Sequence, residues 1–133
     1  MKTVFLDTVG MLALWDDADQ WHSAADAAMT ALDETPCRMV TTPFVVLECG
    51  NAASRSSYRQ EVASLRDELA TFGNLILPTE HEEENAWQAY VQGQAGEAGI
   101  VDHLSFVVMR RLGISQAFTN DRHFVSAGFE VLF

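Results

Sequence analysis

Apolar residues along this chain follow two patterns. Short continuous apolar runs predict buried strands, and longer segments with an apolar residue every three or four positions predict amphipathic helices. The predicted strands are residues 4–6, 38–41, 75–77, 114–118 and 131–133. The predicted helices are residues 10–17, 18–32, 43–55, 56–69, a segment starting with a capping box at Thr79, and 100–112, with residues 93–99 as a loop. Strands and helices therefore alternate along the chain.

This alternation indicates the fold class. Short apolar strands separated by helices are typical of an α/β protein with a mostly parallel sheet covered on both faces. A chain of 133 residues fits a single domain, residues 1–133, around one core. In such sheets, sites form beyond the carboxyl ends of the strands. Polar residues directly after a predicted strand are therefore the strongest functional candidates.

Net charge narrows the possible functions. The chain has 19 acidic residues against 8 lysines and arginines, a formal net charge of −11, and Lys2 is its only lysine. A protein that coats nucleic acid needs a basic surface, so that class is excluded. No apolar run is long enough to cross a membrane, and the N-terminus lacks the features of a secretory signal, so we expect a cytoplasmic protein.

Four acidic residues are candidates for a site. Asp7 directly follows the first predicted strand, and Asp121, in the stretch FTNDRHF, directly follows the fourth. Glu48 and Asp102 are each the lone acid in an otherwise apolar helix. Carboxylates in such positions are costly unless something compensates their charge. A divalent cation, Mg²⁺ or Mn²⁺, would compensate all four, would let an acidic protein approach a phosphodiester, and would activate a water for its hydrolysis.

Simpler explanations remain open for single members of this set. Glu48 fits equally well as an ion-paired or edge-exposed residue, and Asp121 fits an ordinary turn. The four histidines show no zinc spacing. We interpret His103, next to Asp102, and His123, two residues after Asp121, as surface or core-edge residues, with a supporting contact to the site or a contact to the substrate as the alternative. The chain also lacks the GxSxG motif of serine hydrolases and the glycine-rich phosphate loop.

Four segments together resemble one known family. They are VFLDT, TPFVVLECGNAASR, AGIVDHLSFVVMRRLGI and AFTNDRHFVSAGFEVL, in that order along almost the whole chain. They are similar to PIN-domain proteins, in particular to the VapC-like toxins of toxin–antitoxin pairs. The resemblance implies a three-layer α/β/α sandwich with a mostly parallel sheet of about five strands. It also implies a Mg²⁺- or Mn²⁺-dependent ribonuclease.

The resemblance also assigns roles to residues. Asp7, Glu48, Asp102 and Asp121 match the four family acids, as catalytic residues and metal ligands. Thr119 matches a supporting hydroxyl, whereas Asn120 stands where the family often has an apolar residue. Another departure is Val9, which replaces a small polar residue and leaves Thr8 as the only hydroxyl of the first motif. The further supporting or substrate-binding candidates are Thr8, Asn51, Asn120, Arg122 and Arg55.

Partners are likewise implied by the resemblance. They are an RNA substrate, a small antitoxin that places a basic residue in the acidic pocket, and a second copy of the chain in a homodimer. An acidic pocket in an acidic protein agrees with a basic partner. Arg55, Arg59 and Arg66 would share one helical face if that helix were continuous, and could contact phosphates.

Two other functions are compatible with parts of the sequence. The first is a PIN-like binding module that acts through a protein partner with little or no catalysis. The second is a haloacid-dehalogenase-like phosphatase, because FLDTVG also places an aspartate after a first strand. That chemistry needs an acid two residues later and a downstream lysine, and here Val9 follows and no lysine comes after Lys2.

Overall fold

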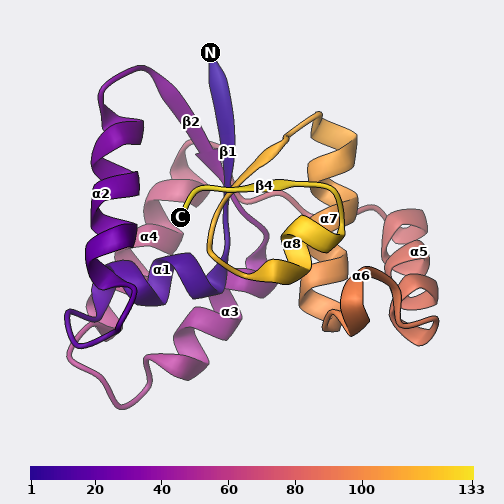
Figure 1. Cartoon of the computed structure of the whole chain (residues 1–133), viewed down its shortest axis with the longest axis horizontal. Helices are drawn as coiled ribbons and strands as arrows, with labels where there is room; N and C mark the ends of the chain where they lie inside the picture. The colour runs from indigo at the N-terminus through magenta and orange to yellow at the C-terminus, as the bar shows by residue number, and fades with distance from the viewer.

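The computed structural model describes all residues, 1–133, and arranges them as four strands and eight helices (Figure 1). The strands are β1 (Lys2–Leu6), β2 (Cys37–Val40), β3 (Gln116–Phe118) and β4 (Glu130–Val131). The helices are α1 (Thr8–Trp15), α2 (His22–Asp33), α3 (Pro43–Ala52), α4 (Arg59–Thr71), α5 (Glu80–Val91), α6 (Gln94–Glu97), α7 (Ile100–Leu112) and α8 (Arg122–Ser126). Helices lie on both sides of the strands, with α1, α2 and α4 on one side and α5 and α7 on the other (Figure 1). The predicted α/β sandwich is confirmed.

All strand pairs of the sheet are parallel, in the order β2-β1-β3-β4. Leu6, the last residue of β1, pairs with Phe118, the last residue of β3. The two neighbouring strands therefore end side by side. This register brings Asp7 and the Thr119–Asp121 segment, which are distant in sequence, to the same edge of the sheet.

The sheet has four strands instead of the predicted five. Residues 75–77 are extended beside β2, but they form only one isolated parallel bridge, between Thr41 and Leu75. Its hydrogen bonds run from the Thr41 amide to the Asn74 carbonyl (3.1 Å) and from the Ile76 amide to the Thr41 carbonyl (2.8 Å). Pairing ends there because Leu77 turns outward into solvent and Pro78 has no amide hydrogen to donate.

Buried aromatic rings join the sheet to the helices. The core is one cluster of 22 buried residues. In its centre, Phe106 of α7 meets Phe124 of α8 edge to face, with 5.0 Å between ring centroids, and Phe124 in turn lies 6.5 Å from Phe5 of β1. Contacts of this type add about 0.5–1.5 kcal/mol to area burial. They fix α7 and α8 against the strand that precedes Asp7.

Helix α1 packs unusually close to β3 at Gly10. A side-chain carbon at this position would overlap the backbone carbonyl oxygen of Phe118. The Asp7 amide also donates a hydrogen bond to that carbonyl, at 3.4 Å. Only glycine lets the helix approach this closely, and the approach holds the backbone of Asp7 against the end of β3.

Local sequence explains several helix starts. The predicted capping box is confirmed: the Glu82 amide donates to the Thr79 hydroxyl (3.1 Å) and the Thr79 amide donates to the Glu82 carboxylate (2.8 Å). Helix α4, however, begins at Arg59 rather than at residue 56, so Arg55 lies in the turn between α3 and α4. The expected arginine face therefore keeps Arg59 and Arg66 and loses Arg55.

The predicted loop at 93–99 contains a compact left-handed turn. Besides Gly93 and Gly96, the non-glycine residues Ala95 and Glu97 have positive φ angles, 54° and 61°. This turn, α6, packs against α8. None of the helices is both long and apolar enough to cross a membrane.

Candidate active site

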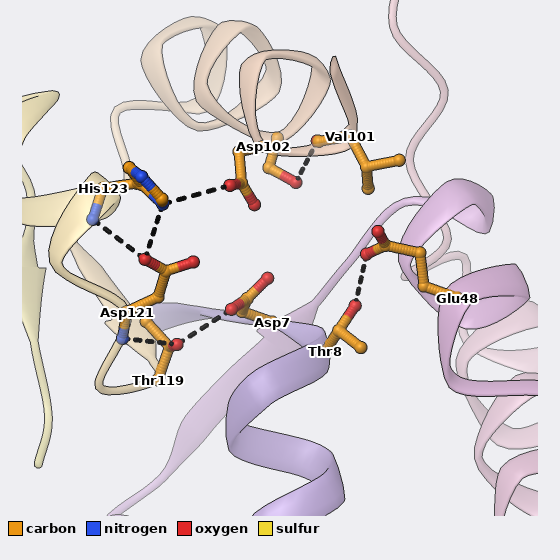
Figure 2. A network of polar contacts seen from close by, with 9 residues as sticks. Asp7, Thr8, Glu48, Val101, Asp102, Thr119, Asp121 and His123 are labelled. Atoms are coloured by element: carbon orange, nitrogen blue, oxygen red, sulfur yellow. Dashed lines mark hydrogen bonds and ion pairs between the residues drawn. The ribbon is translucent and has the colours of Figure 1, made fainter. Parts of the chain in front are cut away.

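The centre of the site is a buried hydrogen bond between residues that follow β1 and β3. The Thr119 hydroxyl donates to Oδ2 of Asp7 at 2.8 Å (Figure 2). Both side chains are buried, with exposures of 2% for Asp7 and 0% for Thr119. The parallel register of β1 and β3 creates this contact, because each residue directly follows its strand.

Asp7 stands at the N-cap of α1 but does not cap it. Its side chain makes no capping hydrogen bond. Burial, reinforced by the charges of Asp102 and Asp121, raises its pKa to about 7, although the Thr119 hydroxyl and the Thr8 amide partly oppose the rise. Asp7 is therefore a buried acid whose charge no neighbouring lysine or arginine neutralises.

Asp121 has a different local role. It is the N-cap of α8, where Oδ1 accepts a hydrogen bond from the His123 amide at 2.9 Å. Its own amide donates to the Thr119 hydroxyl at 3.1 Å. Thr119 thus connects Asp7 with Asp121, as Figure 2 shows.

Asp102 approaches from the opposite side, on the first turn of α7 (Figure 2). Burial raises its pKa to about 6, with further increases from Asp121 and Glu48, whereas His123 lowers it. The mutual repulsion shows that the acids lie close enough to share one electrostatic environment. A cation would relieve it.

Glu48 joins the site from α3 through a single strong contact. The Thr8 hydroxyl donates to Oε1 of Glu48 at 2.6 Å (Figure 2). Thr8 therefore lies where a supporting hydroxyl is expected. Its neighbour Val9 is 38% exposed and outside this network.

His123 also belongs to the cluster, although no ligand spacing in the sequence points to it. Its Nδ1 atom lies 2.9 Å from Oδ1 of Asp121 and 3.8 Å from Oδ2 of Asp102. Ligand atoms of these three residues all lie within 4.8 Å of one another. The only local signal was its position two residues after Asp121. His103, in contrast, is buried against Phe106 and outside the cluster.

The remaining predicted residues lie outside the hydrogen-bond network. Asn120 is half-buried and Arg122 is exposed, both beside Asp121. Asn51 lines a separate hollow of about 320 Å³ between α3 and α4, together with Arg59 and Arg66. Arg55 is exposed in the turn next to that hollow. None of these four side chains forms an ion pair or a hydrogen bond with Asp7, Glu48, Asp102 or Asp121.

The donor set of the site fits a hard divalent cation. Four carboxylates and a threonine hydroxyl supply oxygen, which Mg²⁺ and Mn²⁺ prefer. No lysine or arginine forms an ion pair with any of the four acids. The arginines nearest in sequence to Asp102 are otherwise engaged: Arg111 binds Glu82, and Arg110 lies over Phe106 and Phe129. The chain therefore supplies no lysine or arginine as a counter-charge, and the basic side chain beside these acids is His123, next to Asp121 and Asp102.

Comparison with known proteins agrees with this geometry. The family model described as PIN domain matches residues 4–130. The chain is 32% identical over 127 residues to proteins named 23S rRNA-specific endonuclease VapC20 from two strains of Mycobacterium tuberculosis, CDC 1551 / Oshkosh and H37Rv, covering 95% of each chain.

A solved structure gives the same result in three dimensions. The crystal structure of Mycobacterium tuberculosis VapC20, described as a sarcin-ricin loop cleaving toxin, matches with a TM-score of 0.79 at 30% identity over 95% of both chains. Sequence and fold both match along almost the full length. This chain therefore belongs to the PIN-domain family and is VapC-like.

Proposed function

We propose that this protein is a divalent-metal-dependent endoribonuclease and the toxin of a type II toxin–antitoxin pair. The observation that carries the proposal is the buried Asp7, whose charge faces Asp102 and Asp121 without a basic partner, in a chain of the PIN-domain family. Relatives over 95% of the chain are named as endonucleases of 23S rRNA. With the family assigned, the phosphatase alternative is dropped.

Each acid has a distinct part in this proposal. Asp7, Glu48, Asp102 and Asp121 hold Mg²⁺ or Mn²⁺. When bound, the cation compensates the carboxylates, lowers the pKa of a water and stabilises the departing oxygen of the phosphodiester. Thr119 orients the carboxylate of Asp7, and Thr8 orients that of Glu48, so that their remaining oxygens are free to act as ligands.

Residues around the acids meet the RNA. Arg122 and Asn120 border Asp121, and Asn51 and Arg55 extend the surface from Glu48 toward the α3–α4 hollow. We propose that they contact phosphates and riboses on either side of the cleaved bond. The first substrate to test is 23S rRNA with its sarcin-ricin loop, because the relatives' names give that target. An intracellular RNA substrate supports the proposal of a cytoplasmic location.

The partners follow from the same family. We propose a small antitoxin whose basic residue enters the acidic centre, and a homodimer that aligns two sites. The charge of −11 favours a basic inhibitory segment.

A cleavage assay tests the proposal. Purified protein is incubated with ribosomes and with a sarcin-ricin stem–loop in Mg²⁺, Mn²⁺ or EDTA, beside Asp7→Asn and Asp102→Asn. We expect one metal-dependent cut that both variants lose. Cleavage in EDTA, or full activity of both variants, would contradict the mechanism.

The same preparation tests the alternative of a binding module without catalysis. That alternative predicts no cut with either cation but stable co-purification with the product of the adjoining gene. A toxin should show both the cut and the capture, and the captured partner should inhibit the cut.

A further inference from the structure

The inference concerns His123 and rests on the proposed function, since it describes how that site chooses its cation. The His123 ring points into the space between Asp102 and Asp121 (Figure 2). Its Nδ1 atom, rather than a ring carbon, faces both carboxylates, at 2.9 Å and 3.8 Å. A carbon at 2.9 Å from a carboxylate oxygen would be repelled, so the observed orientation of the ring is the one that its chemistry requires.

The opposite edge of the ring faces the left-handed turn. A side-chain carbon on Gly96, if one were present, would lie 3.6 Å from Cδ2 of His123, an ordinary van der Waals distance, so Gly96 is a neighbour of the ring. The turn keeps Ala95 and Glu97 at positive φ, a conformation that costs a non-glycine residue about 1 kcal/mol or more. The ring of His123 therefore lies between the two carboxylates on one side and this strained turn on the other.

These distances match the spacing of ligands around one ion. Ligands about 2.1 Å from an octahedral cation lie about 3.0 Å apart when adjacent and about 4.2 Å apart when opposite. The 2.9 Å separation to Asp121 is close to the value for adjacent ligands, and the 3.8 Å separation to Asp102 lies between the two values. One nitrogen and two carboxylate oxygens can therefore reach a common ion with small side-chain shifts.

We propose that Nδ1 of His123 is a direct ligand of the cation held by Asp102 and Asp121, and that it makes this site prefer Mn²⁺ over Mg²⁺. Magnesium is bound almost entirely through oxygen, whereas imidazole nitrogen binds transition metals well and Mn²⁺ stands at the start of that series. A nitrogen ligand thus strengthens Mn²⁺ binding and does little for Mg²⁺.

The decisive test detects the nitrogen itself. Pulsed electron paramagnetic resonance of bound Mn²⁺ reports a coupling to a directly bonded imidazole nitrogen, and ¹⁵N-histidine labelling changes that coupling. We expect the signal in the wild-type protein and in His81→Asn, a control on exposed α5, and its loss in His123→Asn. Bound Mn²⁺ without nitrogen coupling in the wild-type protein, or coupling that persists in His123→Asn, overturns the proposal.

Calorimetric titration measures the selectivity for Mn²⁺ over Mg²⁺. In His123→Asn we expect Mn²⁺ affinity to fall about tenfold or more and Mg²⁺ affinity to change less than about twofold. Equal losses for both cations would overturn the selectivity. Circular dichroism and the thermal midpoint without metal confirm that the variant folds.

Failure of this inference is distinguishable from failure of the proposed function. Wild-type protein that cleaves RNA with Mg²⁺ and binds Mn²⁺ through oxygen alone retains the function and refutes the role of His123. Protein that binds neither cation refutes both.

Discussion

The ends of β1 and β3 carry the same local order, a strand, then an aspartate, then a helix, yet the two aspartates behave differently. Asp121 caps α8 by accepting the His123 amide, whereas Asp7 occupies the N-cap of α1 without a side-chain cap bond. A helix cap therefore accounts for the position of Asp121, in addition to the role in the site that we propose for it. No capping bond accounts for the buried position of Asp7.

The helices that follow differ as well. The third residue of α8 is Phe124, which fills the core between Phe5 and Phe106. The third residue of α1 is Gly10, which leaves no side chain, so α1 lies directly against β3. The helix after β3 is thus held by a buried aromatic side chain, and the helix after β1 by close contact between its backbone and that of β3. At the β3 end the side chain of Phe124 fills the core, and at the β1 end the missing side chain of Gly10 lets the helix that follows Asp7 approach β3.

The largest effect should come from removing the charge of each aspartate in turn. We expect Asp7→Asn to lower the rate of RNA cleavage by about 10³-fold, because this buried carboxylate has no substitute. Asp121→Asn keeps the helix cap, since asparagine caps as well as aspartate. We expect this variant to cleave RNA about tenfold more slowly than the parent. Single-turnover cleavage at saturating Mn²⁺ measures both. A greater loss for Asp121→Asn would reverse the order of importance that we assign to the two strand ends.

A methyl group added at Gly10 should disrupt the close contact between α1 and β3. Gly10→Ala should reduce the free energy of unfolding by roughly 3 kcal/mol, because the new carbon meets the backbone carbonyl of Phe118, which cannot move without disturbing the β1–β3 pair. Gly50→Ala on α3 is the matched control. Nothing lies within 4 Å of a side-chain carbon there, so it should stabilise by about 0.5–1 kcal/mol. Urea unfolding measures both, and equal effects would contradict the packing argument.

The charge of Asp7 should make the metal-free protein less stable as pH rises. Its pKa is raised from 3.8 to about 7 in the folded protein, so folded Asp7 keeps its proton at pH values where unfolded Asp7 has lost it. The stabilisation present below pH 4 is therefore lost progressively up to about pH 7.

Asp7→Asn should remove most of this loss and raise the free energy of unfolding at pH 8 by roughly 2–4 kcal/mol. Urea titrations in EDTA from pH 5 to pH 8 measure the slope for the parent and the variant. Adding Mn²⁺ at pH 8 should restabilise the parent more than the variant. An Asp7→Asn variant that is less stable than the parent at pH 8 would show that the carboxylate is structural.

Much of this architecture follows from local sequence patterns. Apolar runs identify the segments of all four strands, and an aspartate after the first strand marks Asp7, because strand ends and their polar residues are local features. The capping box at Thr79 is local too, and it was predicted correctly.

The features that depend on distant segments could not be read from the chain. Gly10 is constrained by Phe118, and His123 gains its importance from Asp102 on another helix. The 75–77 segment has the composition of a strand, but Pro78 and the outward Leu77 stop its pairing after one bridge. The arginine face was predicted only for a continuous helix, and that condition is not met because the turn before Arg59 separates Arg55 from α4. In each case, either the residue that makes the contact is distant in sequence, or the strand or helix has other limits than its pattern of apolar residues predicts.

The smallest expected effect separates capping from charge at the β3 end. Asp121→Ala removes the acceptor of the His123 amide and should cost about 1 kcal/mol of folding free energy in EDTA. Asp121→Asn retains the oxygen acceptor, and its loss of folding free energy should be less than about half of the loss for Asp121→Ala. Urea unfolding at pH 6 compares the two variants, and the cleavage assay compares them again with Mn²⁺.

The two readouts should diverge. In stability, Asp121→Asn should resemble the parent, because the cap needs only an oxygen acceptor. In cleavage, it should resemble Asp121→Ala, because a cation needs the negative charge that both variants lack. If both variants match the parent in cleavage, Asp121 is a cap and nothing more, and the acidic centre consists of Asp7, Glu48 and Asp102.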